Sequence, residues 1–298
     1  MMKHKQTLPQ KLLRRLYHVP LEVLNMHPQV SPEPEVMSDL GQRLHAAVKD
    51  LKQHAVDPVT GQVAYAQVAQ SALYQGYRTL TGQLANLNLD TLGDEQAQRA
   101  FWINIYNALT IDAIIALGVR ESVQEVPQFW MRAAYHMGGY RFSLDDIEHG
   151  ILRGNAGHPF IPGRQFGPDD PRLRWVLPLD FRIHFALVCG ADSCPPIRVY
   201  DPDKLDAQLH LALFWLNIHV TSIQSPSHGQ VRLPRLLMWY SGDFGAHLGL
   251  RFGLGKSLVL LRAIAPFIQD ARKRDWLLGL QAPVPVQFAP YNWSLNGA

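Results

Sequence analysis

The stretch that decides the fold is Phe101-Trp102-Ile103-Asn104-Ile105-Tyr106-Asn107-Ala108-Leu109, which is apolar on nearly every side. A helix that is hydrophobic all round is usually buried inside a protein. The surrounding pattern predicts a helix from about Asp94 to Leu117, and Gly118 is a good C-terminal stop. We therefore expect a central helix with the rest of the domain built around it.

Two polar side chains interrupt this helix. Asn104 and Asn107 are three residues apart and share one face. A buried amide costs about 1–3 kcal/mol unless its hydrogen bonds are made. Two interpretations stay open: the asparagines tie neighbouring backbone together, or they line a site.

Most of the segments around the central helix are also predicted to be helical. Apolar residues recur at helical spacing from about Ser31 to Ala55 and again from Tyr65 to Leu84, with Gly76 as a candidate break. Ser143 and Asp146 resemble a capping box that opens a helix ending at Gly154. Within that helix Asp145 and His149 form an i,i+4 pair, so the carboxylate is placed to orient the imidazole.

Later segments alternate between extended and helical patterns. Phe181 to Val188 is the best strand candidate, and the glycine- and proline-rich segment Gly157 to Pro171 before it predicts a loop. Asp203 to about Leu216 has a helical leucine stripe, and Val284 to Leu295 has an extended pattern that is suited to closing the sheet.

Together these patterns predict an α+β fold. It has a central apolar helix packed on a mostly antiparallel sheet and a helix-rich N-terminal half. A cluster of prolines (Pro28, Pro32 and Pro34) separates an N-terminal extension, residues 1–30, from a single domain, residues 31–298.

Composition excludes several classes of protein. Of the 298 residues 47% are hydrophobic and 18% charged, which is enough for a large core and argues against disorder. The formal charge is only +3, from 28 basic and 25 acidic side chains, so no nucleic-acid partner is expected. Two cysteines make no disulfide framework.

The sequence argues against a membrane-spanning anchor. Arg14, Arg15 and the neighbouring leucines are compatible with a short basic amphipathic helix that touches a membrane or a partner, but a frayed or docked terminal helix is favoured. Charges interrupt the N-terminal residues every few positions, so no signal peptide is expected. Uncharged apolar runs stay well short of the roughly 20 residues that cross a bilayer, so no stable membrane insertion is expected. The predicted location is the cytoplasm.

Reactive side chains gather just after the predicted strand. His184, Cys189 and Cys194 lie within eleven residues of one another. A thiol becomes a useful nucleophile when a neighbouring base or positive charge stabilises its thiolate. Cys194 is the better candidate because Ser193 and two prolines fix its backbone in a turn, whereas Cys189, after a buried strand, is expected to be a small core residue.

Other interpretations of these residues stay open. The two cysteines are also compatible with a loop disulfide or a redox pair, and His184 with a hydrogen-bonded core histidine. A metal site built from His149, His184 and both cysteines is disfavoured, because the spacing lacks the tight Cys-x-x-Cys pairs of a zinc ribbon.

Several blocks of sequence carry a family resemblance. Phe101 to Leu109, Ser143 to Arg153 and Ile183 to Pro196 resemble the signature blocks of the domain of unknown function 547 family. Further agreement comes from Trp239-Tyr240 with Asp243-Phe244 and from Tyr291 to Asn296, so that the resemblance covers roughly Val36 to Ala298. It implies no settled activity.

A looser similarity is to the papain and transglutaminase core. In that core the nucleophilic cysteine begins the central helix, where this chain has Asn104 and Asn107 and no cysteine. The resemblance therefore implies that the thiol has moved to Cys194 or that catalysis has been lost.

The leading hypothesis is an enzyme of thiol chemistry, a hydrolase or an acyl or thiol transferase acting on a small molecule or peptide without a cofactor. Cys194 is the expected nucleophile and His184 its base, and Asn104 or Asn107 orients the imidazole or donates to an oxyanion. The expected substrate contacts are Glu148, His149, Arg153 and Cys189, with a second acid–base pair as the alternative role of Glu148 and His149. The alternatives are a non-catalytic binding or scaffold domain and a metal-binding protein, and the sequence gives no oligomeric state.

Overall fold

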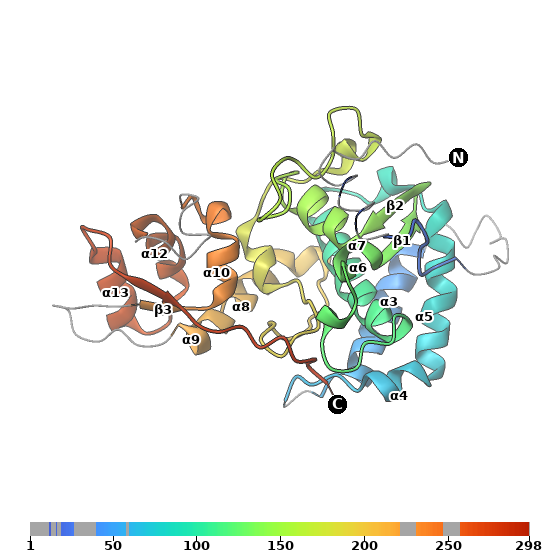
Figure 1. Ribbon diagram of the computed structural model, residues 1–298, viewed down its shortest axis with the longest axis horizontal. Helices are drawn as coiled ribbons and strands as arrows, with labels where there is room; N and C mark the ends of the chain where they lie inside the picture. Colours follow the sequence, from blue (N-terminus) through green and yellow to red (C-terminus); the bar gives the residue numbers. More distant parts are fainter. Residues whose placement is uncertain are drawn as a thin grey trace. The chain divides into compact units, whose positions relative to one another are not determined.

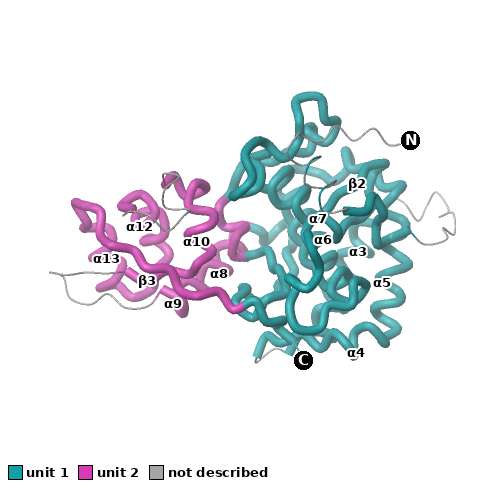
Figure 2. Tube along the Cα trace, viewed as in Figure 1, with its two compact units in different colours: residues 1–180, 186–205, 293–298 teal, residues 181–185, 206–292 magenta. Residues whose placement is uncertain are grey.

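The computed structural model describes residues 19–26, 40–57, 60–220, 231–246 and 257–297, together with Leu12 and Leu16. The chain divides into two compact units, shown in Figure 2, and each is described by itself below. Unit 1 comprises residues 1–180, 186–205 and 293–298; unit 2 comprises residues 181–185 and 206–292.

Unit 1 begins with a layer of helices. They are α3 (Leu40–Ala55), α4 (Tyr65–Ala69) and α5 (Ala72–Gln83), of which α3 and α5 pack together. The expected helix over residues 31–55 is confirmed from Leu40 onward, and the part before it lies outside the described residues. The break after Tyr65 falls at Ser71 and not at Gly76, because the Ser71 side chain accepts the backbone N–H of Tyr74 (3.1 Å) and so starts a new helix.

The central helix is α6 (Glu95–Ala116), as the sequence predicts. The Asp94 side chain caps it by accepting the backbone N–H of Ala97 at 2.9 Å. All residues from Trp102 to Ile114 are buried. One of them is a carboxylate, Asp112, which accepts hydrogen bonds from the hydroxyls of Tyr74 (2.5 Å) and Tyr135 (2.7 Å). These bonds join α6 to the helix layer and to the first strand of the unit (Figure 1).

That strand belongs to a small hairpin. Strand β1 (Ala134–Met137) pairs antiparallel with β2 (Tyr140–Ser143), in a register that places Ala134 opposite Ser143. The early chain packs against the hairpin: the backbone N–H of His136 donates to Asn25 Oδ1 at 2.8 Å, and Asn25 Nδ2 donates to the carbonyl of Thr81 at 2.7 Å. Residues 19–26 of the expected N-terminal extension are thus held on unit 1.

A π-helical segment, η4 (Asp146–Leu152), follows the hairpin directly. The capping box is confirmed: Ser143 N–H donates to Asp146 Oδ2 at 3.1 Å, and Asp146 N–H donates to Ser143 Oγ at 3.2 Å. Wide π-turns of this kind are frequent at functional sites. Short one-turn helices complete the unit: η1 (Leu84–Asn86), η2 (Leu89–Thr91), η3 (Val123–Glu125), α7 (Phe129–Arg132), η5 (Pro171–Trp175) and η7 (Pro202–Lys204).

The strand expected from Phe181 to Val188 is wrong. Residues Phe181–Phe185 form a 3-10 helix, η6, and residues 187–189 are irregular. The backbone of Ala186 and Val188 bonds to the side chain of Asn107 and not to a neighbouring strand. The Asn107 side chain thus makes the backbone hydrogen bonds that a neighbouring strand would otherwise make. No local sequence pattern predicts such a contact.

Unit 2 is formed by short helices and one small sheet. Its helices are α8 (Leu205–Ala212), α9 (Trp215–His219), α10 (Arg235–Trp239), η8 (Ser241–Phe244), α12 (Leu258–Ile264), η9 (Ala265–Phe267) and α13 (Ala271–Gly279). The helix expected from Asp203 to Leu216 is therefore divided. Strand β3 (Val231–Leu233) pairs with β4 (Val286–Phe288) in parallel, so the expected extended tail does contribute to a sheet.

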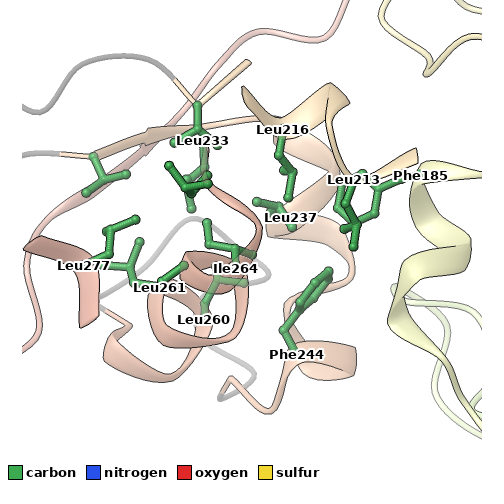
Figure 3. Close-up of a cluster of buried hydrophobic side chains, with 14 of the residues drawn as sticks. Phe185, Leu213, Leu216, Leu233, Leu237, Phe244, Leu260, Leu261, Ile264 and Leu277 are labelled. Carbon is green, nitrogen blue, oxygen red and sulfur yellow. The ribbon is translucent and has the colours of Figure 1, made fainter. Parts of the chain in front are cut away.

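Unit 2 has an apolar core of its own, shown in Figure 3. Leu237, Leu261 and Ile264 are completely buried in it, and Phe185 joins them from η6. The fold class α+β is confirmed. The two sheets are two-stranded, β1–β2 antiparallel and β3–β4 parallel. Within the described ranges no helix combines the length and apolar character needed to cross a bilayer.

Candidate functional site

The two cysteines lie together at the ends of a tight loop of unit 1, residues 189–194, which we call the thiol loop. Their sulfur atoms are 2.6 Å apart, and the backbone N–H of Cys189 points at the Cys194 sulfur at 3.1 Å. The Cys194 N–H closes the turn by donating to the carbonyl of Ala191 at 2.9 Å. Both residues are half-buried, so Cys189 is not the enclosed core residue that we expected.

A glycine makes this loop possible. Gly190 has φ +81°, which residues with side chains rarely adopt, and a Cβ there would collide with the side chain of Ile114 on α6. The backbone can therefore pass close to the central helix and return Cys194 to Cys189.

The C-terminal residues hold the other side of the loop. Ala191 and Leu295 form an antiparallel bridge, the Asp192 N–H donates to the Ser294 carbonyl (2.8 Å), and the Asn296 N–H donates to the Gly190 carbonyl (2.9 Å). These contacts fix the backbone on both flanks of the thiols.

A phenol lies beside the pair. Burial, with smaller contributions from Cys194 and then Cys189, raises the pKa of Tyr65 well above its usual range. Its hydroxyl stays protonated and donates to Asn296 Oδ1 at 2.7 Å. Neither Tyr65 nor Asn296 is predicted as a site residue from the sequence, because 231 residues separate them and no spacing rule connects them.

Asn104 and Asn107 use their amides on backbone. Asn104 Nδ2 donates to the Tyr200 carbonyl (2.8 Å) while its Oδ1 accepts the Tyr200 N–H (2.9 Å). Asn107 bonds in the same way to the Ala186 carbonyl (2.9 Å) and to the Val188 N–H (3.0 Å). These contacts support the interpretation in which the two asparagines tie neighbouring backbone segments together. The catalytic role of either amide stays a prediction.

His184 is held within unit 2. Its Nε2 lies 2.8 Å from Asp243 Oδ2, and its ring stacks on that of Tyr240 with centroids 4.0 Å apart. A buried carboxylate at this distance fixes the orientation of the imidazole. The sequence indicates Asp243 and Tyr240 only through the family resemblance, and 59 residues separate His184 from Asp243. His184 and Cys194 belong to different units, so their pairing stays a prediction.

The expected substrate contacts form a second polar cluster in unit 1. The Tyr106 hydroxyl donates to Glu148 Oε2 at 2.9 Å, and Arg153 NH1 lies 2.9 Å from His149 Nδ1. The expected pair of His149 with Asp145 is confirmed, with Nε2 and Oδ1 3.7 Å apart. Cys189 lies instead with Cys194 on the thiol loop. Because Glu148, His149 and Arg153 are buried, they position one another; contact with a substrate stays a prediction.

Adjacent carboxyl groups in this cluster have opposite pKa shifts. Burial, together with the nearby Glu148 and Asp146, raises the pKa of Asp145 to about 8. For Asp146 burial acts in the same direction, but the charge of Arg172 and a hydrogen bond from Gln165 outweigh it and lower the pKa to about 2. The Arg172 guanidinium lies 3.2 Å from Asp146 and 2.8 Å from Asp170. Asp145 is therefore protonated near neutral pH, whereas Asp146 is ionised.

A metal centre finds no support in the described part of the chain. There, no three side chains of histidine, cysteine, aspartate or glutamate are grouped as a metal ion requires. Of the four residues considered from the sequence, the two sulfurs lie together and His149 lies on η4 of unit 1, whereas His184 lies on η6 of unit 2.

Comparison with known proteins adds one finding. Residues 89–214 match the family described as "Protein of unknown function, DUF547". The matched residues include the asparagines of α6, the π-helix and the thiol loop. The match covers fewer residues than the resemblance seen in the sequence, which extends over roughly Val36 to Ala298. No curated protein and no solved structure gave a match. The similarity to the papain and transglutaminase core therefore has no support from solved structures.

Proposed function

We propose that the chain is a thiol-dependent enzyme in which Cys194 is the reacting thiol and Cys189 the resolving one. The observation that carries the proposal is the 2.6 Å separation of their sulfurs on a half-exposed loop. The Cys189 N–H directed at the Cys194 sulfur supports the assignment of roles, because a donor at this position favours the thiolate of Cys194.

The reaction that this pair fits is thiol–disulfide exchange with a small molecule or peptide, R–S–S–R′. The Cys194 thiolate attacks one sulfur, the Cys194–S–R bond forms, and R′–S⁻ leaves with the electron pair. The Cys189 thiolate then attacks the Cys194 sulfur and expels R–S⁻. The substrate is reduced by two electrons, and the two cysteines are oxidised to a disulfide. A low-molecular-weight thiol returns the pair to its reduced form by the reverse exchange.

In the hydrolase or acyl-transferase form of the hypothesis, the Cys194 sulfur instead attacks a carbonyl carbon and His184 acts as its base. The orientation of His184 by Asp243 is compatible with this form. Exchange is favoured because it needs no oxyanion donor, and the amides of Asn104 and Asn107 are already bonded to backbone.

The test uses an aromatic disulfide, 5,5′-dithiobis(2-nitrobenzoate), whose released thiolate is coloured. We expect the wild type to release two thiolates per chain and to keep no mixed disulfide in its mass spectrum. Cys189→Ala, which keeps the backbone N–H, is expected to release one and to retain the adduct on Cys194. Cys194→Ala is expected to lose the fast phase, and Ser193→Ala is the matched control in the same turn.

Two results would contradict the exchange. If Cys194 reacts no faster with iodoacetamide than glutathione does at pH 7, it is not an activated thiol. The non-catalytic binding or scaffold domain would then be the favoured hypothesis. If Cys189→Ala retains no adduct while p-nitrophenyl acetate acylates Cys194, the acyl-transfer form replaces the exchange.

A further inference from the structure

His184 in unit 2 and His149 in unit 1 are both buried, but their rings are held in different ways. The side chain of His184 is 1% exposed and that of His149 is 4% exposed. Each has a carboxyl group beside Nε2: Asp243 lies 2.8 Å from His184, and Asp145 lies 3.7 Å from His149. The two histidines differ at the other ring nitrogen, Nδ1.

In His149 the Nδ1 lone pair is already used. The Arg153 guanidinium lies 2.9 Å from this nitrogen. A guanidinium has only donors and stays protonated in proteins, so Nδ1 is the acceptor of the bond and the ring hydrogen is on Nε2. His149 therefore offers no lone pair to a reactant.

In His184 the Nδ1 lone pair is available. Because Nε2 donates its hydrogen to the Asp243 carboxylate, the nitrogen without a hydrogen is Nδ1. Nδ1 makes no hydrogen bond within the described part of the chain, and it is not one of the polar atoms there that are fully buried without a partner. An atom with neither a partner nor complete burial is open to solvent, so a small reactant can reach this lone pair.

Two contacts within unit 2 hold the ring of His184 in this orientation. The Tyr240 ring stacks on it with centroids 4.0 Å apart and an interplanar angle of 24°. Asp243, whose side chain is only 7% exposed, holds Nε2 from η8. A ring that is fixed before a reactant arrives needs little reorganisation when it takes a proton.

We propose that His184 is a general base whose reacting atom is Nδ1, with Asp243 as its positioning residue. A hydroxyl, thiol or water X–H at the opening loses its proton to Nδ1: the X–H bond breaks, the N–H bond forms, and X keeps the electron pair. The Asp243 carboxylate balances the charge of the imidazolium that forms. This proposal extends the acyl-transfer form of the proposed function, in which His184 is the base, and it holds whether or not the thiols exchange disulfides.

The test uses diethyl pyrocarbonate, which modifies imidazole nitrogens that carry a free lone pair. Peptide mapping by mass spectrometry, after a short exposure of the full chain at pH 7, gives the extent of modification of each histidine. We expect His184 to be modified although its side chain is almost wholly buried. His149 is the matched buried reference and is expected to react roughly tenfold more slowly or less, because its charge-assisted hydrogen bond to Arg153 must break first.

Nitrogen NMR of the histidine rings tests the role of Asp243. We expect the hydrogen of His184 on Nε2 in the wild type. In Asp243→Asn the amide can donate to Nε2, which moves the ring hydrogen to Nδ1 and is expected to lower the modification of His184 roughly tenfold. A purely structural Asp243 would instead loosen the ring and raise the modification. Asp275→Asn, the same change at an exposed residue of α13, is the matched control and is expected to change neither readout.

Several results would overturn the proposal. They are an unmodified His184 under conditions in which the exposed His54 reacts, equal modification of His184 and His149, and a wild-type ring hydrogen on Nδ1 of His184. Unchanged or increased modification in Asp243→Asn would remove the positioning role. The comparison of the two buried histidines needs no variant, so it decides the proposal even if Asp243→Asn does not fold. The aromatic disulfide reports on the thiols and the pyrocarbonate map on the imidazole, so the two proposals can fail separately.

Discussion

Asp145 and Asp146 show how far neighbouring residues can differ within one cluster. For Asp145 the charge of Arg141 only partly offsets burial and the negative charges nearby, so this carboxyl holds its proton to about pH 8. Asp146 has Arg172 at 3.2 Å and ionises at about pH 2. Both carboxyls open the same π-helix, so the contrast comes from their neighbours and not from the backbone.

The raised pKa of Asp145 predicts a stability that depends on pH. In the unfolded chain this carboxyl loses its proton near pH 4, whereas in the native protein it keeps it until about pH 8. The native state thus binds more protons in this window, and the contribution of Asp145 to the free energy of unfolding falls as pH rises from about 4 to about 8. The loss is on the order of a few kcal/mol.

Asp145→Asn removes this titration while keeping the shape of the side chain. We expect the variant to match the wild type near pH 4.5 and to be more stable at pH 8, as measured by urea unfolding at both values. The exposed Asp50→Asn is the control and is expected to leave the pH dependence unchanged. An Asp145→Asn variant with the wild-type slope would show that this carboxyl ionises normally.

At the scale of elements, α6 organises unit 1 through side chains that bond to distant backbone. Asn107 holds residues 186 and 188, and Asn104 holds residue 200, so the chain between these two points carries the thiol loop. The sequence predicts the burial of this helix face. It does not predict which backbone the amides reach, because the partners are 79 to 96 residues away.

Removing one of these amides is expected to be costly. Asn107→Ala leaves the Ala186 carbonyl and the Val188 N–H buried and without the hydrogen bonds that Asn107 makes. Two such losses predict a destabilisation of about 2–4 kcal/mol. Urea unfolding measures it, and hydrogen exchange is expected to show faster exchange of the Val188 amide in particular. Asn107→Asp, which keeps the acceptor for Val188 and loses the donor to Ala186, tests the two bonds separately. A loss below about 0.5 kcal/mol for Asn107→Ala would mean that water or another group replaces the amide.

At the scale of the whole molecule, the chain has two apolar cores. The core of unit 2 is formed by residues of α8, α9, α10, η8, α12 and α13 with the β3–β4 pair, and Phe185 of η6 is buried in it (Figure 3). Unit 1 has α6 at its centre. Because residues within a unit pack chiefly with one another, local opening is expected to follow the units.

A cavity in the second core tests this division. Leu261→Ala removes a completely buried side chain and is expected to cost about 2–5 kcal/mol. Hydrogen exchange is expected to show the largest loss of protection in α10, α12 and α13, with α6 little changed. Leu278→Ala, at an exposed leucine of α13, is the control. Equal loss of protection in α6 would show that the two cores open as one.

The sequence by itself determined the features that depend on neighbours along the chain. The central helix, the capping box of Ser143 and Asp146, and the pair of Asp145 with His149 follow from spacings of three or four residues. Composition and periodicity were also enough for the fold class. The placement of two cysteines in one short turn was enough to predict where thiol chemistry is worth testing.

Only the tertiary structure decided the features that depend on distant partners. An apolar run from Phe181 to Val188 has strand character, yet none of the strands in the described residues pairs with it, and Asn107 bonds to the backbone of Ala186 and Val188 instead. The orientation of His184 depends on Asp243, and the two cysteines contribute to the raised pKa of Tyr65, which lies on α4. A periodic pattern records which face of a segment is buried but not what it is buried against, so these contacts could not be derived from the chain alone.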